Sequence, residues 1–257
     1  MIDNKRVLAI IPARLGSTRL PRKILRDIAG KSLIRRVYEQ ALKVSVIDQV
    51  VIAVDAEETK DHVRAFGATA VMTSPDHISG TDRCAEVAAM HPEFELVINI
   101  QGDEPFVDPG HLDMLAHLIA REGVSLATLI CPLTHQDDFI NPNVVKVVTD
   151  HNGNALYFSR ASVPFQRAKA AGSFALNDFS HRHIGLYAYR RQTLMEITKL
   201  PPGQLEQIEM LEQLRWLEAG LSIYTARVNA PEPGIDTEED LDRACAFCLG
   251  REGEKLP

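Results

Sequence analysis

The sequence contains few cysteines, and their spacing disfavours the usual cysteine-based sites. Four cysteines occur among 257 residues, and only Cys245 and Cys248 are close together, in C-A-F-C. One such pair supplies only two of the four ligands of a tetrahedral zinc site. A zinc or redox role is therefore disfavoured, and we interpret the pair as small apolar side chains on a C-terminal helix.

Long apolar runs and an excess of positive charge are also absent. No segment approaches the roughly 20 apolar residues of a transmembrane helix, so we expect no membrane insertion and a cytoplasmic location. The formal net charge of -7 makes non-specific binding to a phosphate polymer unfavourable, so no nucleic-acid partner is expected. A small phosphate ligand is still compatible with this charge, because it needs only a local cluster of Lys and Arg.

Two common nucleotide-binding motifs are missing as well. Gly30-Lys31-Ser32 resembles the end of a P-loop, but Leu25 stands where that motif requires its first glycine. No G-x-G-x-x-G occurs either, so the dinucleotide fingerprint is absent. The sequence therefore disfavours both a P-loop hydrolase and an NAD-dependent enzyme.

The first half of the chain alternates between strand-like and helix-like patterns. Apolar runs predict strands at residues 7–11, 49–54, 68–72 and 96–100, and amphipathic segments predict helices at 32–41, 57–66 and 81–90. This alternation predicts an α/β fold with a mostly parallel central sheet. In such a sheet, ligands bind at the carboxyl ends of the strands.

The second half is richer in strands. Residues 143–150, 155–159 and 183–190 resemble antiparallel strands, 205–219 a strong helix and 222–226 a further strand, and Thr237 opens a final helix. We interpret residues 1–257 as one domain, with a core of about 1–140 and 220–257 and a smaller β-rich lobe of about 141–219.

Polar residues that suit a nucleotide follow the predicted strands. Arg14, Arg19, Arg22 and Lys23 lie on one loop after the first strand, and such a loop suits a polyphosphate, although a solvated basic loop is the alternative. Asp103 in N-I-Q-G-D-E-P follows another strand, and together with Asp236 in P-G-I-D-T it could hold Mg²⁺. Taken singly, Asp103 could cap the next helix, and for Asp236 a helix start before Thr237 is a stronger alternative. The loop at residues 77–83 could face a base edge, but alone it is weak evidence.

The second half carries a further polar set. Arginine suits a carboxylate, and His, Tyr, Glu and Gln suit sugar hydroxyls. The set consists of Arg160, Arg167, His183, Tyr187, Glu212 and Gln213. Taken singly, His183 would be interpreted as a strand histidine whose ring nitrogens are hydrogen-bonded within the fold. Glu212 would be interpreted as an exposed acidic residue on a helix.

Seven segments along the chain carry a family resemblance. In order, they are I-P-A-R-x-x-S-T-R-L-P, H-x-S-G-T-D-R, N-I-Q-G-D-E-P, A-L-Y-F-S-R, H-I-G-L-Y-A-Y, I-E-M-L-E-Q-L-R and G-I-D-T-E-E-D-L. Together they resemble the 3-deoxy-manno-octulosonate (Kdo) cytidylyltransferase family. The resemblance implies a nucleotidyltransferase α/β sandwich whose β-rich lobe binds the sugar and forms a homodimer. It also implies coupling of Kdo to CTP, giving CMP-Kdo and pyrophosphate for lipopolysaccharide synthesis.

The same resemblance assigns roles to individual positions. It implies that CTP is bound by Arg14, Ser17, Arg19, Lys23, Ser79, Thr81 and Gln101, that Asp103 and Asp236 hold Mg²⁺ and are catalytic together with Lys23, and that Kdo is bound by Arg160, Arg167, His183, Tyr187, Glu212 and Gln213. One departure concerns the loop, where the family usually has L-P-G-K-P-L and this chain has L-P-R-K-I-L. Arg22 thus replaces a glycine, and a side chain there disfavours a positive φ.

Two alternatives stay open at this point. The chain could activate another acid sugar, such as sialic acid or 8-amino-Kdo. It could also be a catalytically silent nucleotide-binding protein, although such a protein has no need to retain both Asp103 and Asp236. An assay of pyrophosphate release from CTP, with Mg²⁺ and Kdo, distinguishes these alternatives from a Kdo cytidylyltransferase.

Overall fold

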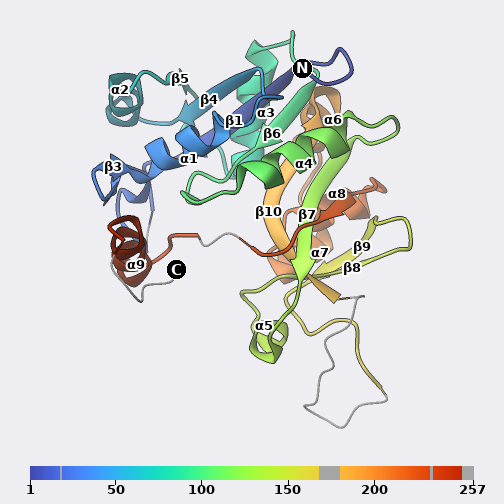
Figure 1. Ribbon diagram of the computed structural model, residues 1–257. Coiled ribbons are helices and arrows are strands. Elements are labelled where there is room, and N and C mark those ends of the chain that lie inside the picture. The colour runs from blue at the N-terminus through green and yellow to red at the C-terminus, as the bar shows by residue number, and fades with distance from the viewer. Residues whose placement is uncertain (18, 168–179, 232–233, 251–257) are drawn as a thin grey trace.

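The computed structural model describes residues 1–17, 19–167, 180–231 and 234–250, and in this part of the chain nine strands form one large sheet (Figure 1). Its main path runs β11 (Tyr224–Arg227), β7 (Leu126–Pro132), β10 (Ser180–Arg190), β6 (Leu96–Asn99), β1 (Val7–Ala13), β4 (Gln49–Val54) and β5 (Thr69–Met72). On this path β10 alone is antiparallel to its neighbours, so the predicted α/β fold with a mostly parallel sheet is confirmed.

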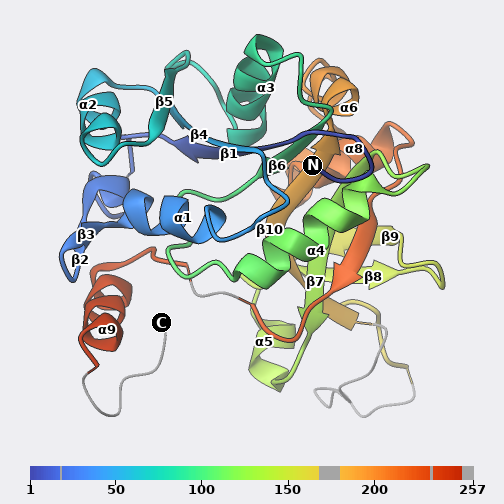
Figure 2. The same ribbon diagram turned by 45° about the horizontal axis from the view of Figure 1, so that its top comes forward.

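Helices cover both faces of this sheet, as Figure 2 shows. One face is covered by α1 (Leu33–Ala41), α2 (Glu57–Ala65), α4 (Pro109–Ala120) and α9 (Glu238–Cys248), and the other by α3 (Gly80–Met90), α6 (Arg191–Ile197) and α8 (Gln213–Glu218). Alternate residues of β1 enter different cores: Ile11 packs in the first and Ile10 in the second. A strand that is buried on both faces requires a continuous apolar run, which is the pattern seen in the sequence.

The predicted single helix at residues 205–219 is wrong. The chain forms α7 (Gln204–Glu209) and α8, separated at Met210, whose φ of 53° lies in the left-handed region. The N–H of Leu211 donates back to the Glu206 carbonyl at 3.2 Å, which is a common way to end a helix. The Arg160 guanidinium then binds the carbonyls of Glu209 and Met210 at 2.7 and 3.2 Å. A partner about 50 residues away therefore stabilises a break that the helical periodicity does not reveal.

The β-rich segment is not detached from the main sheet. β8 (Lys146–Thr149) pairs with the first residues of β10 and with β9 (Ala155–Ser159), whereas the rest of β10 lies between β6 and β7. The side chain of Lys146 is fully buried, and its ammonium donates to three backbone carbonyls, two of them at 2.6 Å. The division into a core and a lobe of about 141–219 stays a prediction.

The cysteines and the helices add two findings. Cys245 and Cys248 are free thiols on α9, and within the described ranges no group of three or more His, Cys, Asp or Glu side chains is arranged to hold a metal ion. Among the described helices, none combines the length and the apolar character needed to cross a bilayer.

Candidate active site

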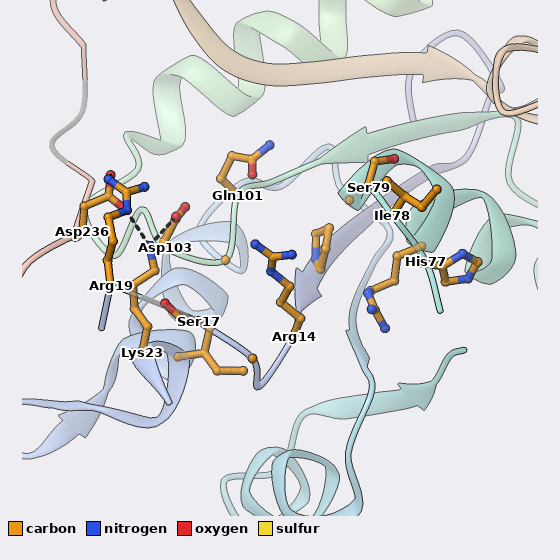
Figure 3. A pocket seen from close by; sticks show the side chains of 16 residues that line it. Arg14, Ser17, Arg19, Lys23, His77, Ile78, Ser79, Gln101, Asp103 and Asp236 are labelled. Carbon is orange, nitrogen blue, oxygen red and sulfur yellow. Dashed lines mark hydrogen bonds and ion pairs between the residues drawn. The ribbon is translucent and has the colours of Figure 1, made fainter. Parts of the chain in front are cut away.

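A pocket of about 310 Å³ opens at the carboxyl ends of β1 and β6, where the sequence predicted a ligand site (Figure 3). Its lining combines the basic loop, the loop before α3 and the segment after β6. The lining residues are Pro12, Arg14, Gly16, Ser17, Arg19, Lys23, Ile24, His77, Ile78, Ser79, Gly80, Arg83, Gln101, Gly102, Asp103 and Asp236. Segments that are more than 200 residues apart in the sequence, at Lys23 and Asp236, thus meet in one cavity.

The Lys23 ammonium lies between the two predicted metal-binding acids. Its Nζ is 2.7 Å from Asp103 Oδ2 and 2.9 Å from Asp236 Oδ1, as the dashed lines in Figure 3 mark. Burial lowers the pKa of Lys23, but the Coulombic attraction and hydrogen bonds of the two carboxylates outweigh that effect and leave the pKa raised. The ammonium is therefore charged at neutral pH, and the two carboxylates converge on one cation.

Backbone contacts explain why the two acids meet. The N–H of Ile235 donates to the Asp103 carbonyl at 3.0 Å, which fixes the segment that carries Asp236. Gly102 comes so close to the Pro12 carbonyl that a Cβ at this position would collide with it. The glycine therefore brings the end of β1 against the loop after β6, which is a close approach of two backbone segments.

The loop around Lys23 adopts its conformation in spite of the replaced glycine. Arg22 has φ 57° and ψ 32°, in the left-handed region, and forms an ion pair with Glu58. The N–H of Lys23 donates to the Leu20 carbonyl at 3.1 Å, and Leu20 is fully buried. The expected obstacle to a positive φ is thus overcome, and Lys23 points at the acid pair.

The remaining cations of the loop differ in their partners. Arg19 Nη1 is 3.2 Å from Asp236 Oδ2. Arg14 is exposed, lines the pocket and forms no hydrogen bond or ion pair with any described residue. Ser17 lines the pocket on the same loop (Figure 3). The pocket therefore presents an unpaired guanidinium beside a paired lysine, which is an arrangement suited to an anionic ligand.

The predicted nucleoside residues are only partly brought together. Ser79 lines the pocket and caps α3, accepting a hydrogen bond from the Asp82 N–H. Gln101 lines the pocket too, and its amide donates to the Gly185 carbonyl of β10 at 3.0 Å. Thr81 is 4% exposed and does not line the pocket; its hydroxyl donates to Glu212 at 2.6 Å.

Two of the predicted sugar-binding residues, His183 and Tyr187, pack together on β10 and do not line this pocket. The ring centroids of His183 and Tyr187 are 5.4 Å apart, and Tyr187 packs edge-on against Trp216 of α8. Burial lowers the pKa of His183 to about 3, and burial and the nearby Glu212 raise that of Tyr187. Gln213 is buried at the start of α8. His183 and Tyr187 are therefore neutral hydrogen-bonding groups at neutral pH.

The two predicted carboxylate-binding arginines are placed differently. The Arg160 guanidinium donates to the backbone carbonyls of Pro142, Glu209 and Met210 at 3.0, 2.7 and 3.2 Å. Arg167 is exposed on a turn. The geometry therefore shows Arg160 holding the break between α7 and α8, and its role towards a sugar stays a prediction.

Sequence reasoning missed Asp55, a residue just behind the pocket. It directly follows β4, as Asp103 follows β6, so the rule that led to Asp103 could also have found it. Its carboxylate contacts the N–H of Leu15 and the guanidinium of Arg83, and Arg83 itself lines the pocket.

Comparison with known sequences gives a consistent result. A model of the cytidylyltransferase family matches residues 8–223. The 3-deoxy-manno-octulosonate cytidylyltransferase of Parabacteroides distasonis is 45% identical over 249 residues, which cover 95% of this chain and 98% of that protein. The protein of the same description from Acidobacterium capsulatum is 47% identical over 235 residues, covering 91% and 93%.

Solved structures agree with these sequences. The structure of a CMP:2-keto-3-deoxy-manno-octonic acid synthetase complexed with CTP superposes with a TM-score of 0.89 at 40% identity, covering 96% of this chain and 99% of that one. The 4-diphosphocytidyl-2C-methyl-D-erythritol synthase of Anaerococcus prevotii superposes with a TM-score of 0.64 at 14% identity, covering 96% and 100%. This second likeness is one of fold alone.

Proposed function

The chain belongs to the 3-deoxy-manno-octulosonate cytidylyltransferase family, and from this premise we propose that it couples Kdo to CTP, forming CMP-Kdo and releasing pyrophosphate for lipopolysaccharide synthesis. The observation that carries the proposal is the convergence of Asp103 and Asp236 on Lys23, beside the unpaired Arg14, in a pocket at the strand ends. This constellation supplies both signs of charge that a triphosphate and its counter-ion require.

The acid pair fits a divalent ion. Two carboxylate oxygens already lie within 3 Å of one cationic nitrogen, and Mg²⁺ is usually held by one or two carboxylates together with substrate phosphates. We propose that Asp103 and Asp236 hold Mg²⁺. When bound, the ion would neutralise phosphate charge and lower the pKa of an oxygen bound to it.

The proposed reaction is attack of the C2 hydroxyl of Kdo on the α-phosphorus of CTP, with pyrophosphate leaving. In such phosphoryl-type transfers the protein contributes mainly positioning and charge neutralisation. Arg14 and Arg19 would bind the phosphates, and Ser17 would donate to a phosphate oxygen. Lys23 would offset the charge that grows on the leaving pyrophosphate. Ser79 and Gln101 would face the nucleoside, and Thr81 would support that wall through Glu212.

The sugar side would use neutral groups. Burial keeps His183 and Tyr187 uncharged, which suits hydrogen bonds to hydroxyls more than binding of the Kdo carboxylate. We propose that Glu212 and Gln213 complete this wall. The carboxylate would be bound by Arg167, and by Arg160 once it releases a backbone carbonyl.

The proposed assembly is a homodimer formed through the β-rich lobe. Four large apolar side chains on this segment are well exposed: Leu156 at 61%, Phe165 at 88%, Ile208 at 78% and Met210 at 75%. Large exposed apolar side chains such as these are candidates for burial against a second copy of the chain. Light scattering should then give about twice the mass of the 28.5 kDa chain.

Pyrophosphate release with CTP, Mg²⁺ and Kdo tests the function directly. We expect turnover with Kdo and at least tenfold lower kcat/KM with sialic acid or 8-amino-Kdo, because an unpaired buried polar group costs about 1–3 kcal/mol. Preference for one of the other acid sugars would reassign the substrate. A chain that binds CTP but releases no pyrophosphate with any of them would be a silent nucleotide-binding protein.

Because CTP is a cytoplasmic nucleotide, we place the reaction in the cytoplasm.

A further inference from the structure

One carboxylate outside the pocket lining contacts both walls of the pocket. Asp55 directly follows β4, and its Oδ1 accepts a hydrogen bond of 2.9 Å from the N–H of Leu15, the residue next to Arg14. Its other oxygen, Oδ2, is 3.5 Å from Arg83 Nη2 on α3. Asp55 therefore joins the basic loop to the helix whose first turn carries Ser79 and Gly80 into the pocket.

Arg83 depends on this carboxylate. The Arg83 side chain is 4% exposed, and that of Asp55 is 14% exposed. A buried guanidinium is costly without an opposite charge and hydrogen-bond acceptors. Besides Asp55, Arg83 donates to the Thr73 hydroxyl at 2.5 Å, and Thr73 in turn donates to the Val54 carbonyl at 2.9 Å. The ends of β4 and β5 are thus tied to α3 through one buried network.

We infer that Asp55 is a positioning residue for CTP, an inference that rests on the proposed function. Its bond to the Leu15 N–H holds the backbone so that Arg14 points into the pocket. Its contact with Arg83 holds α3, so that Ser79 stays at a fixed distance from Arg14. Neither contact involves the sugar-side residues His183, Tyr187 or Gln213. Loss of Asp55 therefore weakens CTP binding and leaves the interaction with Kdo nearly unchanged.

The chain offers a matched control at the opposite end of the same strands. Asp48 directly precedes β4, and its Oδ2 accepts a hydrogen bond of 2.8 Å from the N–H of Val7 at the start of β1. Asp48 and Asp55 thus make the same kind of bond from β4 to the β1 segment. Only Asp55 makes this bond at the carboxyl ends, where the pocket lies.

The test measures CTP affinity by calorimetry, and KM for CTP and Kdo, in the wild type, Asp55→Ala, Asp55→Asn and Asp48→Ala. We expect Asp55→Ala to weaken CTP binding roughly tenfold or more, because it removes the acceptor of the Leu15 N–H and the ion-pair partner of Arg83. Asp55→Asn keeps an acceptor for Leu15 and should lose about threefold to tenfold. Asp48→Ala should lower the melting temperature and keep the wild-type CTP affinity. KM for Kdo should stay within twofold throughout.

Two results would overturn the inference: CTP affinity within twofold of the wild type in Asp55→Ala, or an equal loss in Asp48→Ala. If Asp55→Ala fails to fold, wild-type CTP affinity in Asp55→Asn overturns it instead. A wild-type chain that binds no CTP would contradict the proposed function itself, which separates the two failures.

Discussion

The Thr81 hydroxyl donates a hydrogen bond of 2.6 Å to Glu212 Oε2 across 131 residues of sequence. The bond joins the first turn of α3, beside the pocket, to the residue that precedes α8. Burial raises the pKa of Glu212, and the hydrogen bonds from Thr81 and Ser79 offset this only in part. A buried carboxylate thus links the predicted nucleotide and sugar sides, and its charge depends on pH.

Glu212→Gln should reduce the loss of stability that occurs as pH rises above 4.5. The folded-state pKa of Glu212 lies above its ordinary value of 4.5, so the folded state binds more protons than the unfolded state, and stability falls as pH rises through this window. Glutamine keeps an acceptor for Thr81 and carries no charge. The measurement is the unfolding free energy of both proteins, from urea titrations at pH 5 and pH 8. The value for Glu212→Gln minus the value for the wild type should be higher at pH 8 than at pH 5. The exposed Glu196→Gln serves as control, and a lower relative value at pH 8 would contradict the expectation.

Asp103→Asn and Asp236→Asn should each lower kcat by roughly a hundredfold or more at saturating Mg²⁺, if both orient the ion at the reacting phosphorus. Binding of Mn²⁺, followed by electron paramagnetic resonance, should weaken in parallel. Glu238→Gln is the matched control, because Glu238 lies two residues beyond Asp236 and pairs with Arg26 outside the pocket. Near wild-type turnover in either aspartate variant would remove that residue from the mechanism.

The sequence predicted the strand ends that form the pocket, because parallel strands buried on both faces have an unmistakable pattern. The range predicted for β4, residues 49–54, is the one observed. The basic loop and Asp103 could be placed together because both follow such strands. The contact of Lys23 with both acids could not be foreseen, since it depends on how Gly102 and Ile235 pack against backbone carbonyls.

The second half was harder to predict because its determinants are non-local. The residues of β10 resemble a lobe strand, yet β10 inserts between β6 and β7 in the centre of the sheet. Arg160 binds the carbonyl of Met210 at the helix break, and the hydroxyl of Thr81 binds Glu212. No local pattern encodes such pairs, since each partner has an ordinary position in its own segment.

Arg22→Gly should be more stable than Arg22→Ala. Both variants lose the ion pair with Glu58, whose partners are exposed, so this loss contributes at most about 1 kcal/mol and is shared. They differ in the left-handed φ of 57°, which costs an L-residue about 1 kcal/mol and glycine almost nothing. Urea unfolding should place the glycine variant above the alanine variant by up to about 1 kcal/mol. Equal stabilities would mean that the loop relaxes without a positive φ.

His183→Gln should reduce the loss of stability in acid. Burial lowers the pKa of His183 from 6.5 to about 3, so the folded state binds fewer protons than the unfolded state between these values. The stability from the neutral ring is complete above pH 6.5 and falls towards pH 3, by at most about 1.4 kcal/mol per pH unit. Unfolding free energies at pH 7 and 4.5 should therefore differ less in His183→Gln than in the wild type. The exposed His151→Gln should keep the wild-type difference.

His183→Ala should raise KM for Kdo by roughly tenfold while CTP affinity stays within about twofold. The ring lies with Tyr187 on β10 and bonds to the Thr128 hydroxyl at 3.0 Å, and it does not line the pocket that holds Arg14 and Lys23. If the ring binds Kdo as proposed, its removal deprives a sugar hydroxyl of a partner without disturbing the phosphate site. Calorimetry with each substrate separates the effects, and the variant Tyr38→Phe, on α1 and outside the pocket lining, controls for general loss of fold. If His183→Ala lost CTP affinity and kept Kdo affinity, the sugar would have to bind elsewhere.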